Sequence, residues 1–72
     1  MTAELRLHRE LYAASAVEAA VGVYAPHATI ERADEPAAWV VRITAASPAR
    51  ERRVAGELGN YALGLTVKGR TR

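Results

Sequence analysis

Apolar residues recur with the spacing of an α-helix in the stretch from Ser47 to Lys68. They lie at relative positions i, i+4, i+7, i+8 and i+11, which is one face of a helix with 3.6 residues per turn. Ser47 followed by Pro48 is typical of a helix start, because the first helical position has no intrahelical use for the N–H that proline lacks. We therefore predict one long helix here. Its apolar stripe consists of Val54, Leu58, Tyr61, Ala62 and Leu65.

Three glycines interrupt this predicted helix: Gly56, Gly59 and Gly64. Each costs on the order of 1 kcal/mol relative to alanine in a helix interior. A helix with three such costs is expected to depend on packing within the chain or on contacts with a partner.

The other patterns predict three strands and a shorter helix. Leucines alternate with charged residues from Thr2 to His8, as in a strand with one buried face. Ser15 and Glu18 have the spacing of a capping box, and Pro26 disfavours helical backbone at the preceding residue, so this helix should end near Tyr24. The expected elements before the long helix are a strand over 2–8, a helix over 15–24, a strand over 28–33 and a strand over 38–45.

The order β-α-β-β-α predicts an α+β fold. A polar face on each strand and an apolar stripe on each helix favour a two-layer sandwich, in which both helices cover one face of a small three-stranded sheet. The strand over 38–45 is rich in β-branched residues and is expected to be central. We expect one small domain over 1–68 and a flexible tail over 69–72. The expected core is the long-helix stripe together with Leu5, Leu7, Leu11, Tyr12, Val17, Val21, Tyr24, Ile30, Trp39, Val41 and Ile43.

The size of the chain makes this core small. Seventy-two residues with no Phe and no Cys bury only about 60% of the surface of the unfolded chain, and no disulfide reinforces them. We therefore expect oligomerisation or binding to a partner to add stability that the small core does not supply. The absence of cysteine, of a secretory signal and of a long apolar run is consistent with a cytoplasmic protein that has no membrane segment.

The charge is unevenly distributed along the chain. Residues 1–47 contain four Arg and six acidic residues, which gives −2, whereas residues 48–72 contain six basic residues and two Glu, which gives +4. Arg50, Arg52 and Arg53 begin the basic half. They indicate either an electrostatic footprint for an acidic partner or a solvated helix start. Because no aromatic residues alternate with them as base-stacking platforms, a nucleic-acid partner is not favoured.

No residue pattern indicates catalysis. His8 and His27 have no Asp, Glu or Cys at ligand spacing, and Ser15 and Ser47 are interpreted as helix caps. The glycines of the long helix do not form a phosphate-binding loop, because they lie inside a helix. We therefore expect a protein that is not an enzyme, with no catalytic residue, metal or cofactor.

The side of the long helix opposite the apolar stripe is the candidate partner-binding site. Gly56, Asn60, Leu63 and Val67 share this side, at spacing i, i+4, i+7 and i+11. A solvent-facing surface is usually charged there, whereas small and apolar residues permit close approach of another backbone. The alternative is an ordinary exposed face that tolerates a few apolar residues.

The chain resembles the HxsD-like proteins, which are small proteins of the His-Xaa-Ser peptide-modification systems. The nearest motif is E-L-G-N-Y-A-L at 57–63, which looks like the E-[FL]-x-N-x-x-L helix of that family. The similarity extends over most of residues 5–65. Its other matching points are Leu11-Tyr12, Ala20, Tyr24 and the strand from Trp39 to Ile43.

This resemblance implies a non-catalytic accessory or scaffolding protein of a ribosomal-peptide maturation system. Its partner would be a radical SAM peptide-modifying enzyme or the precursor peptide, in a homodimer or a hetero-complex. The enzyme would hold the iron–sulfur cluster and S-adenosylmethionine. The same element order also looks like the small dimerising subunit of the KEOPS tRNA-modification complex, which is the alternative.

Overall fold

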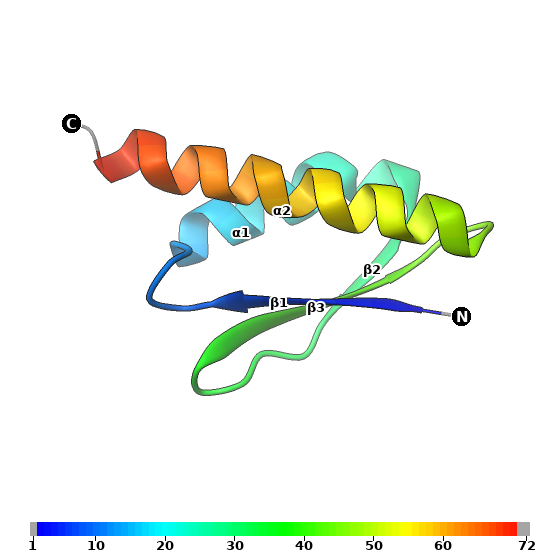
Figure 1. The fold of residues 1–72 in the computed structure, drawn as a ribbon, viewed down its shortest axis with the longest axis horizontal. Coiled ribbons are helices and arrows are strands. Elements are labelled where there is room, and N and C mark those ends of the chain that lie inside the picture. The colour runs from blue at the N-terminus through cyan, green and yellow to red at the C-terminus, as the bar shows by residue number, and fades with distance from the viewer. Residues whose placement is uncertain (1, 71–72) are drawn as a thin grey trace.

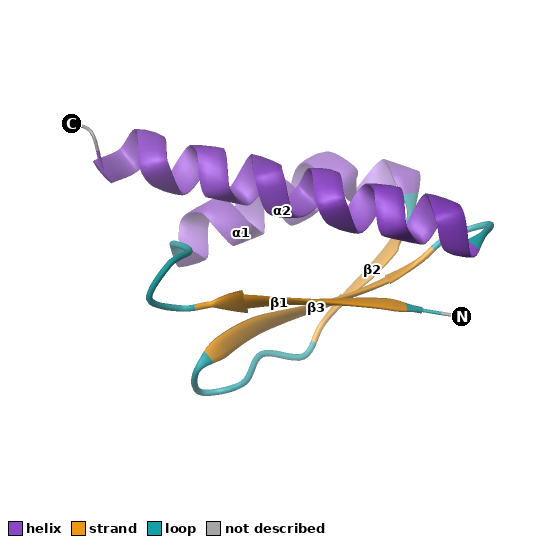
Figure 2. Cartoon of the chain, in the orientation of Figure 1, coloured by secondary structure: helices purple, strands orange, loops and turns teal. Residues whose placement is uncertain are grey.

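Three strands form one antiparallel sheet, and two helices lie along one of its faces (Figures 1 and 2). The computed structural model describes residues 2–70. The two-layer α+β sandwich predicted from the sequence is confirmed. Its elements are β1 (Ala3–His8), α1 (Ala14–Tyr24), a short 3₁₀ helix η1 (Ala25–His27), β2 (Thr29–Arg32), β3 (Ala38–Thr44) and α2 (Pro48–Arg70).

β3 occupies the centre of the sheet, as its β-branched residues predicted. The strand order is β1-β3-β2, and β3 pairs antiparallel with both neighbours. Consequently β1 and β2 are parallel to each other without being adjacent, and each contributes one free edge. The register places Leu5 opposite Val41 and Ile30 opposite Ile43.

The core lies between the sheet and the two helices. Each element except β2 and η1 contributes fully buried apolar side chains, and Leu58 of α2 has no exposed surface. The prediction that Leu11 belongs to the core is wrong: it is 55% exposed, because it lies in the turn between β1 and α1. The buried cluster is Leu7, Val17, Ala20, Val41, Ile43, Val54, Leu58 and Ala62.

The buried stripe of α2 contains two polar residues that the apolar pattern did not include. Glu51 is 3% exposed and Thr66 is 4% exposed. At about 100° per residue, both residues lie beside Leu58 and Ala62, on the side away from Tyr61. The centre of the buried stripe is therefore further from Tyr61 than the apolar residues alone predicted. Tyr61 is therefore 40% exposed at the edge of the stripe, where its ring meets the ring of Tyr24 edge-on at 6.2 Å.

The start of α2 is capped as the sequence predicted. The Ser47 hydroxyl accepts a hydrogen bond from the Arg50 N–H at 3.2 Å. The Glu51 carboxylate reaches back and accepts a bond from the Ala45 N–H at 3.0 Å, which explains why a carboxylate is buried there. The second bond attaches α2 to the residue that follows β3.

The start of α1 is different from the predicted capping box. The helix begins at Ala14 with Ala13 as N-cap, and no side chain caps it, so the prediction for Ser15 and Glu18 is wrong. Instead Thr66 accepts a hydrogen bond from the Ala13 N–H at 3.1 Å and donates one to the Ala62 carbonyl at 2.8 Å. A residue of α2 thus binds the N–H of the N-cap residue Ala13, which in a capping box would be bound by the Glu or Gln at position N3.

Thr66→Val is expected to destabilise the domain by about 1–2 kcal/mol, because the part-buried Ala13 N–H loses its acceptor. Thr66→Ser keeps the hydroxyl and is the matched control. The free energy of unfolding from urea titration would measure both. If Thr66→Val and Thr66→Ser lowered the free energy of unfolding equally, the Thr66 hydroxyl would have no role in stability.

The outer face of the sheet, opposite the helices, holds paired charges. Arg6 binds Glu35 through both guanidinium N–H groups and lies 3.7 Å from Glu4, which in turn lies 3.4 Å from Arg42. Val40, which faces Arg6 across the ladder, is only 1% exposed although it belongs to the face predicted to be polar.

The Arg6–Glu35 pair predicts a pH dependence of stability. Hydrogen bonds from Arg6 hold the pKa of Glu35 below its ordinary value of 4.5, and Arg32 likewise lowers the pKa of Asp34. A carboxyl with a lowered pKa stabilises the fold above its unfolded-state pKa, and this contribution disappears as the pH falls through the folded-state pKa. The wild type should therefore be more stable than Glu35→Gln at neutral pH, and this difference in the free energy of unfolding should shrink as the pH falls from about 5 to 3.

Melting temperatures of both proteins at several pH values would measure this difference. The pair is half exposed, so the effect should be small. If the difference in melting temperature between the wild type and Glu35→Gln increased on acidification, the assigned role of Glu35 would be contradicted.

α2 continues beyond the predicted domain end. Gly69 and Arg70 belong to the helix, whereas the sequence predicted a tail over 69–72; positions 71 and 72 lie outside the described residues. Figure 1 shows the C-terminal end of α2 extending past the sheet. Across residues 2–70, we find no helical segment with the length and apolar character needed to cross a bilayer.

Candidate functional site

The predicted partner-binding residues are all exposed on α2. Gly56 and Asn60 are exposed, Leu63 is 42% exposed and Val67 is 48% exposed. They lie on the side of the helix that faces away from the buried stripe, as their spacing predicted. We call this surface, defined by these four residues, the outer face of α2.

The glycines of α2 have two different environments. A Cβ at Gly59 would lie 3.6 Å from Leu5 of β1, so this glycine faces the sheet and is not part of a partner surface. A Cβ at Gly56 or Gly64 would meet nothing within 4 Å. Gly56 and Gly64 therefore leave room that the described chain does not fill.

The arginines of the sheet and its adjoining turn differ in their contacts from those at the start of α2. Arg6, Arg32 and Arg42 of the sheet each pair with a carboxylate, and Arg9 donates to the Glu35 carbonyl and lies 3.8 Å from the centre of the Trp39 ring. At the start of α2, Arg50, Arg52 and Arg53 make no ion pair with any residue that the structure describes. All three side chains are exposed.

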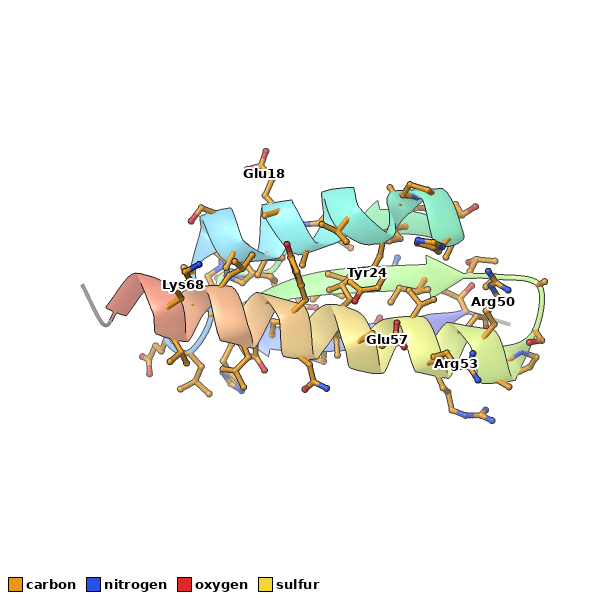
Figure 3. The ribbon with its side chains drawn as sticks, turned by 90° about the horizontal axis from the view of Figure 1, so that it is seen from above. Glu18, Tyr24, Arg50, Arg53, Glu57 and Lys68 are labelled. Atoms are coloured by element: carbon orange, nitrogen blue, oxygen red, sulfur yellow. The ribbon has the colours of Figure 1, made fainter. Side chains whose placement is uncertain are left out.

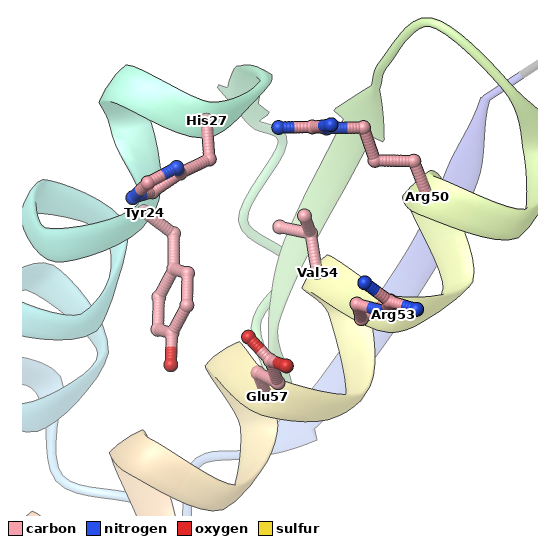
Figure 4. A pocket seen from close by; sticks show the side chains of 6 residues that line it. All are labelled: Tyr24, His27, Arg50, Arg53, Val54 and Glu57. Carbon is pink, nitrogen blue, oxygen red and sulfur yellow. The ribbon is translucent and has the colours of Figure 1, made fainter.

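A hollow of about 240 Å³ lies between the end of α1 and the start of α2 (Figure 4). Seen from above, Tyr24 lies between the two helices, and Arg50, Arg53 and Glu57 follow one another along the first half of α2 (Figure 3). We call this hollow the interhelical pocket. Its lining residues are Tyr24, His27, Arg50, Arg53, Val54 and Glu57.

The charged groups of the interhelical pocket are arranged on two sides. Arg50 extends across the pocket toward His27, whereas the Tyr24 hydroxyl and the Glu57 carboxylate lie on the opposite side (Figure 4). The Tyr24 and His27 rings are 6.3 Å apart. Within the described part of the chain, the polar groups of these side chains make no hydrogen bond or ion pair.

The histidines were the sequence candidates for acid–base or metal chemistry. His8 lies on the outer face of the sheet and His27 lies in η1, so they come from different layers of the molecule. Among residues 2–70, no group of three His, Cys, Asp or Glu side chains is close enough to hold a metal ion.

Sequence reasoning did not find the interhelical pocket, because its two walls are more than 20 positions apart in the chain. The only available signal was the spacing of Arg50, Arg53 and Glu57, which puts them on neighbouring turns of one helix side. The contribution of Tyr24 and His27 depends on α1 packing against α2.

Comparison of the chain with protein families, with curated proteins and with solved structures gives no match. The resemblance to the HxsD-like proteins therefore stays a prediction from the motif at 57–63.

Proposed function

We propose that this protein is a non-catalytic accessory subunit that binds a partner through the outer face of α2. The observation that carries the proposal is the exposure of Leu63 and Val67 beside the small Gly56, on a helix that extends past its own sheet (Figure 1). At about 1.5 Å per residue, the 23 residues of α2 span about 34 Å, whereas the six-residue β1 spans about 20 Å. α2 is thus longer than the strand it packs on, and Leu63 and Val67 stay exposed on its outer face.

The resemblance at 57–63 supports a specific class of partner. We propose that the protein acts in a ribosomal-peptide maturation system, in the cytoplasm, and binds a radical SAM peptide-modifying enzyme or its precursor peptide. The free edge of β1 offers a second contact, because an extended peptide adds to an exposed strand through main-chain hydrogen bonds. The accessory subunit would raise the effective concentration of the peptide at the enzyme.

Titration of the purified protein with the cognate enzyme and with the precursor peptide tests this proposal. Saturable binding of at least one of them at micromolar concentration is expected, and its absence for both would refute the proposal. The mass of the free protein in solution distinguishes a homodimer from a monomer that requires a different partner.

A second candidate function is a dimerising subunit of a tRNA-modification complex. The observation that favours it is the exposed, unpaired state of Arg50, Arg52 and Arg53. A gel shift with tRNA that weakens steeply with salt, and that a non-nucleic polyanion does not reproduce, would support this candidate over the first.

A further inference from the structure

The interhelical pocket brings together hydrogen-bond donors that have no acceptor among residues 2–70. The guanidinium groups of Arg50 and Arg53, the imidazole of His27 and the hydroxyl of Tyr24 line one hollow. In contrast, Arg6, Arg32 and Arg42 of the same chain all pair with carboxylates. Because guanidinium groups bind oxyanions in bidentate geometry, unpaired arginines in a hollow are suited to an anionic ligand.

Arg50 and Arg53 also repel each other. They are three residues apart on one helix, so their side chains are neighbours, and like charges at this spacing destabilise a helix. Glu57 follows Arg53 by one turn, yet it lies beyond ion-pair distance of both arginines. An oxyanion between the two guanidinium groups would offset this repulsion.

The charge of the lining selects the kind of anion. Arg50 and Arg53 contribute two positive charges and Glu57 one negative charge, so these three residues give the pocket a net charge of +1. A singly charged carboxylate matches this balance, whereas the second charge of a phosphate would be repelled by Glu57. Val54 supplies an apolar wall for the carbon atoms beside the carboxylate.

We propose that the interhelical pocket is a binding site for a carboxylate group, held by Arg50 and Arg53 with Tyr24 and His27 as further hydrogen-bond partners. The carboxylate comes either from a small free acid or from an acidic side chain of a peptide. The volume of about 240 Å³ limits the ligand to such a group and its immediate neighbours. This site is separate from the outer face of α2 and does not depend on the partner proposed above.

NMR titration of the isotopically labelled full-length protein tests the site, with four probes. They are N-acetylglycine, a capped Gly-Asp-Gly peptide, its Gly-Asn-Gly counterpart and inorganic phosphate. Saturable shifts at Arg50, Arg53 and Tyr24 with at least one carboxylate probe, and none with the Asn peptide, are the expected result. If the Asp peptide binds more tightly than N-acetylglycine, the natural ligand is an acidic side chain of a peptide. If N-acetylglycine binds more tightly, the natural ligand is a small free acid.

Charge-removing variants separate this site from general attraction of anions by a basic helix. Arg50→Gln and Arg53→Gln should each weaken carboxylate binding about tenfold or more. Arg52→Gln removes the same charge from the same helix turn but lies outside the lining, so it should change the affinity by less than about twofold. Equal losses for all three variants, or no saturable shift with either carboxylate probe, would overturn the proposal.

The role of Glu57 gives an independent check. Glu57→Gln removes the negative charge from the lining of the pocket, so the affinity for phosphate should rise severalfold relative to the affinity for a carboxylate. A wild-type pocket that prefers phosphate, or a Gln variant with unchanged selectivity, would overturn the choice of a carboxylate. Leu63→Glu should leave all these titrations unchanged, which keeps this result distinct from the test of partner binding.

Discussion

Leu58→Glu is expected to unfold the domain. Leu58 has no exposed surface and contacts both the sheet and α1 through the buried cluster. Loss of a buried leucine alone costs about 2–5 kcal/mol, and an uncompensated buried carboxylate adds several more. A domain of 72 residues has a total stability of roughly 4–11 kcal/mol, so the two costs together consume most or all of it.

Circular dichroism during thermal unfolding would measure this effect. We expect no cooperative transition for Leu58→Glu at neutral pH, or one lowered by tens of degrees. A variant that melted within a few degrees of the wild type would show that α2 does not pack on the sheet through Leu58.

Leu63→Glu is expected to abolish partner binding and leave the fold intact. Leu63 is 42% exposed on the outer face of α2, and both leucine and glutamate are good helix formers. The change in the free energy of unfolding should stay within about 1 kcal/mol. At an interface, however, the same carboxylate would be buried against an apolar partner surface, which typically costs a hundredfold or more in affinity.

The pair of variants is matched, since both replace leucine by glutamate five positions apart in one helix. Thermal unfolding and partner titration of each variant separate folding from binding. If Leu63→Glu also unfolded the domain, the outer face would be part of the core. If it bound the partner like the wild type, the contact would lie elsewhere.

Periodicity was sufficient to predict the element order, and the β-branched residues of the strand over 38–45 predicted its central place. The spacing of Val54, Leu58 and Ala62 predicted the buried side of α2, because the side of a helix that carries the apolar stripe packs against the core. The opposite side, with Leu63 and Val67, follows from the same geometry. These features are local, and each is encoded by residues within a few helical turns.

Features that depend on hydrogen bonds from a side chain to the backbone of another segment were not predictable from periodicity. Thr66 is buried and binds the Ala13 N–H, 53 positions away, and Glu51 is buried and binds the Ala45 N–H, six positions away on the other side of the turn before α2. Tyr61 was predicted as core because it is apolar, yet these two polar residues rotate the buried stripe away from it. The predicted cap at Ser15 was wrong because the helix already begins at Ala14, and Thr66 of α2 binds the N–H of the N-cap residue Ala13.

The interhelical pocket illustrates the same limit for function. Arg50 and Arg53 were visible as part of a basic helix start, Glu57 as part of the motif at 57–63, and His27 as one of two histidines without a partner at ligand spacing. Only the packing of α1 against α2 places Tyr24 and His27 beside those charges.

The partner-binding role of α2 is tested most directly by mapping the contact on the protein itself. Amide resonances of labelled protein would be followed during titration with the proposed partner, a radical SAM peptide-modifying enzyme. If α2 binds through its outer face, the largest changes will lie at Gly56, Asn60, Leu63 and Val67, with β2 and the outer face of the sheet unchanged. Changes confined to the sheet, or to the interhelical pocket, would contradict this role.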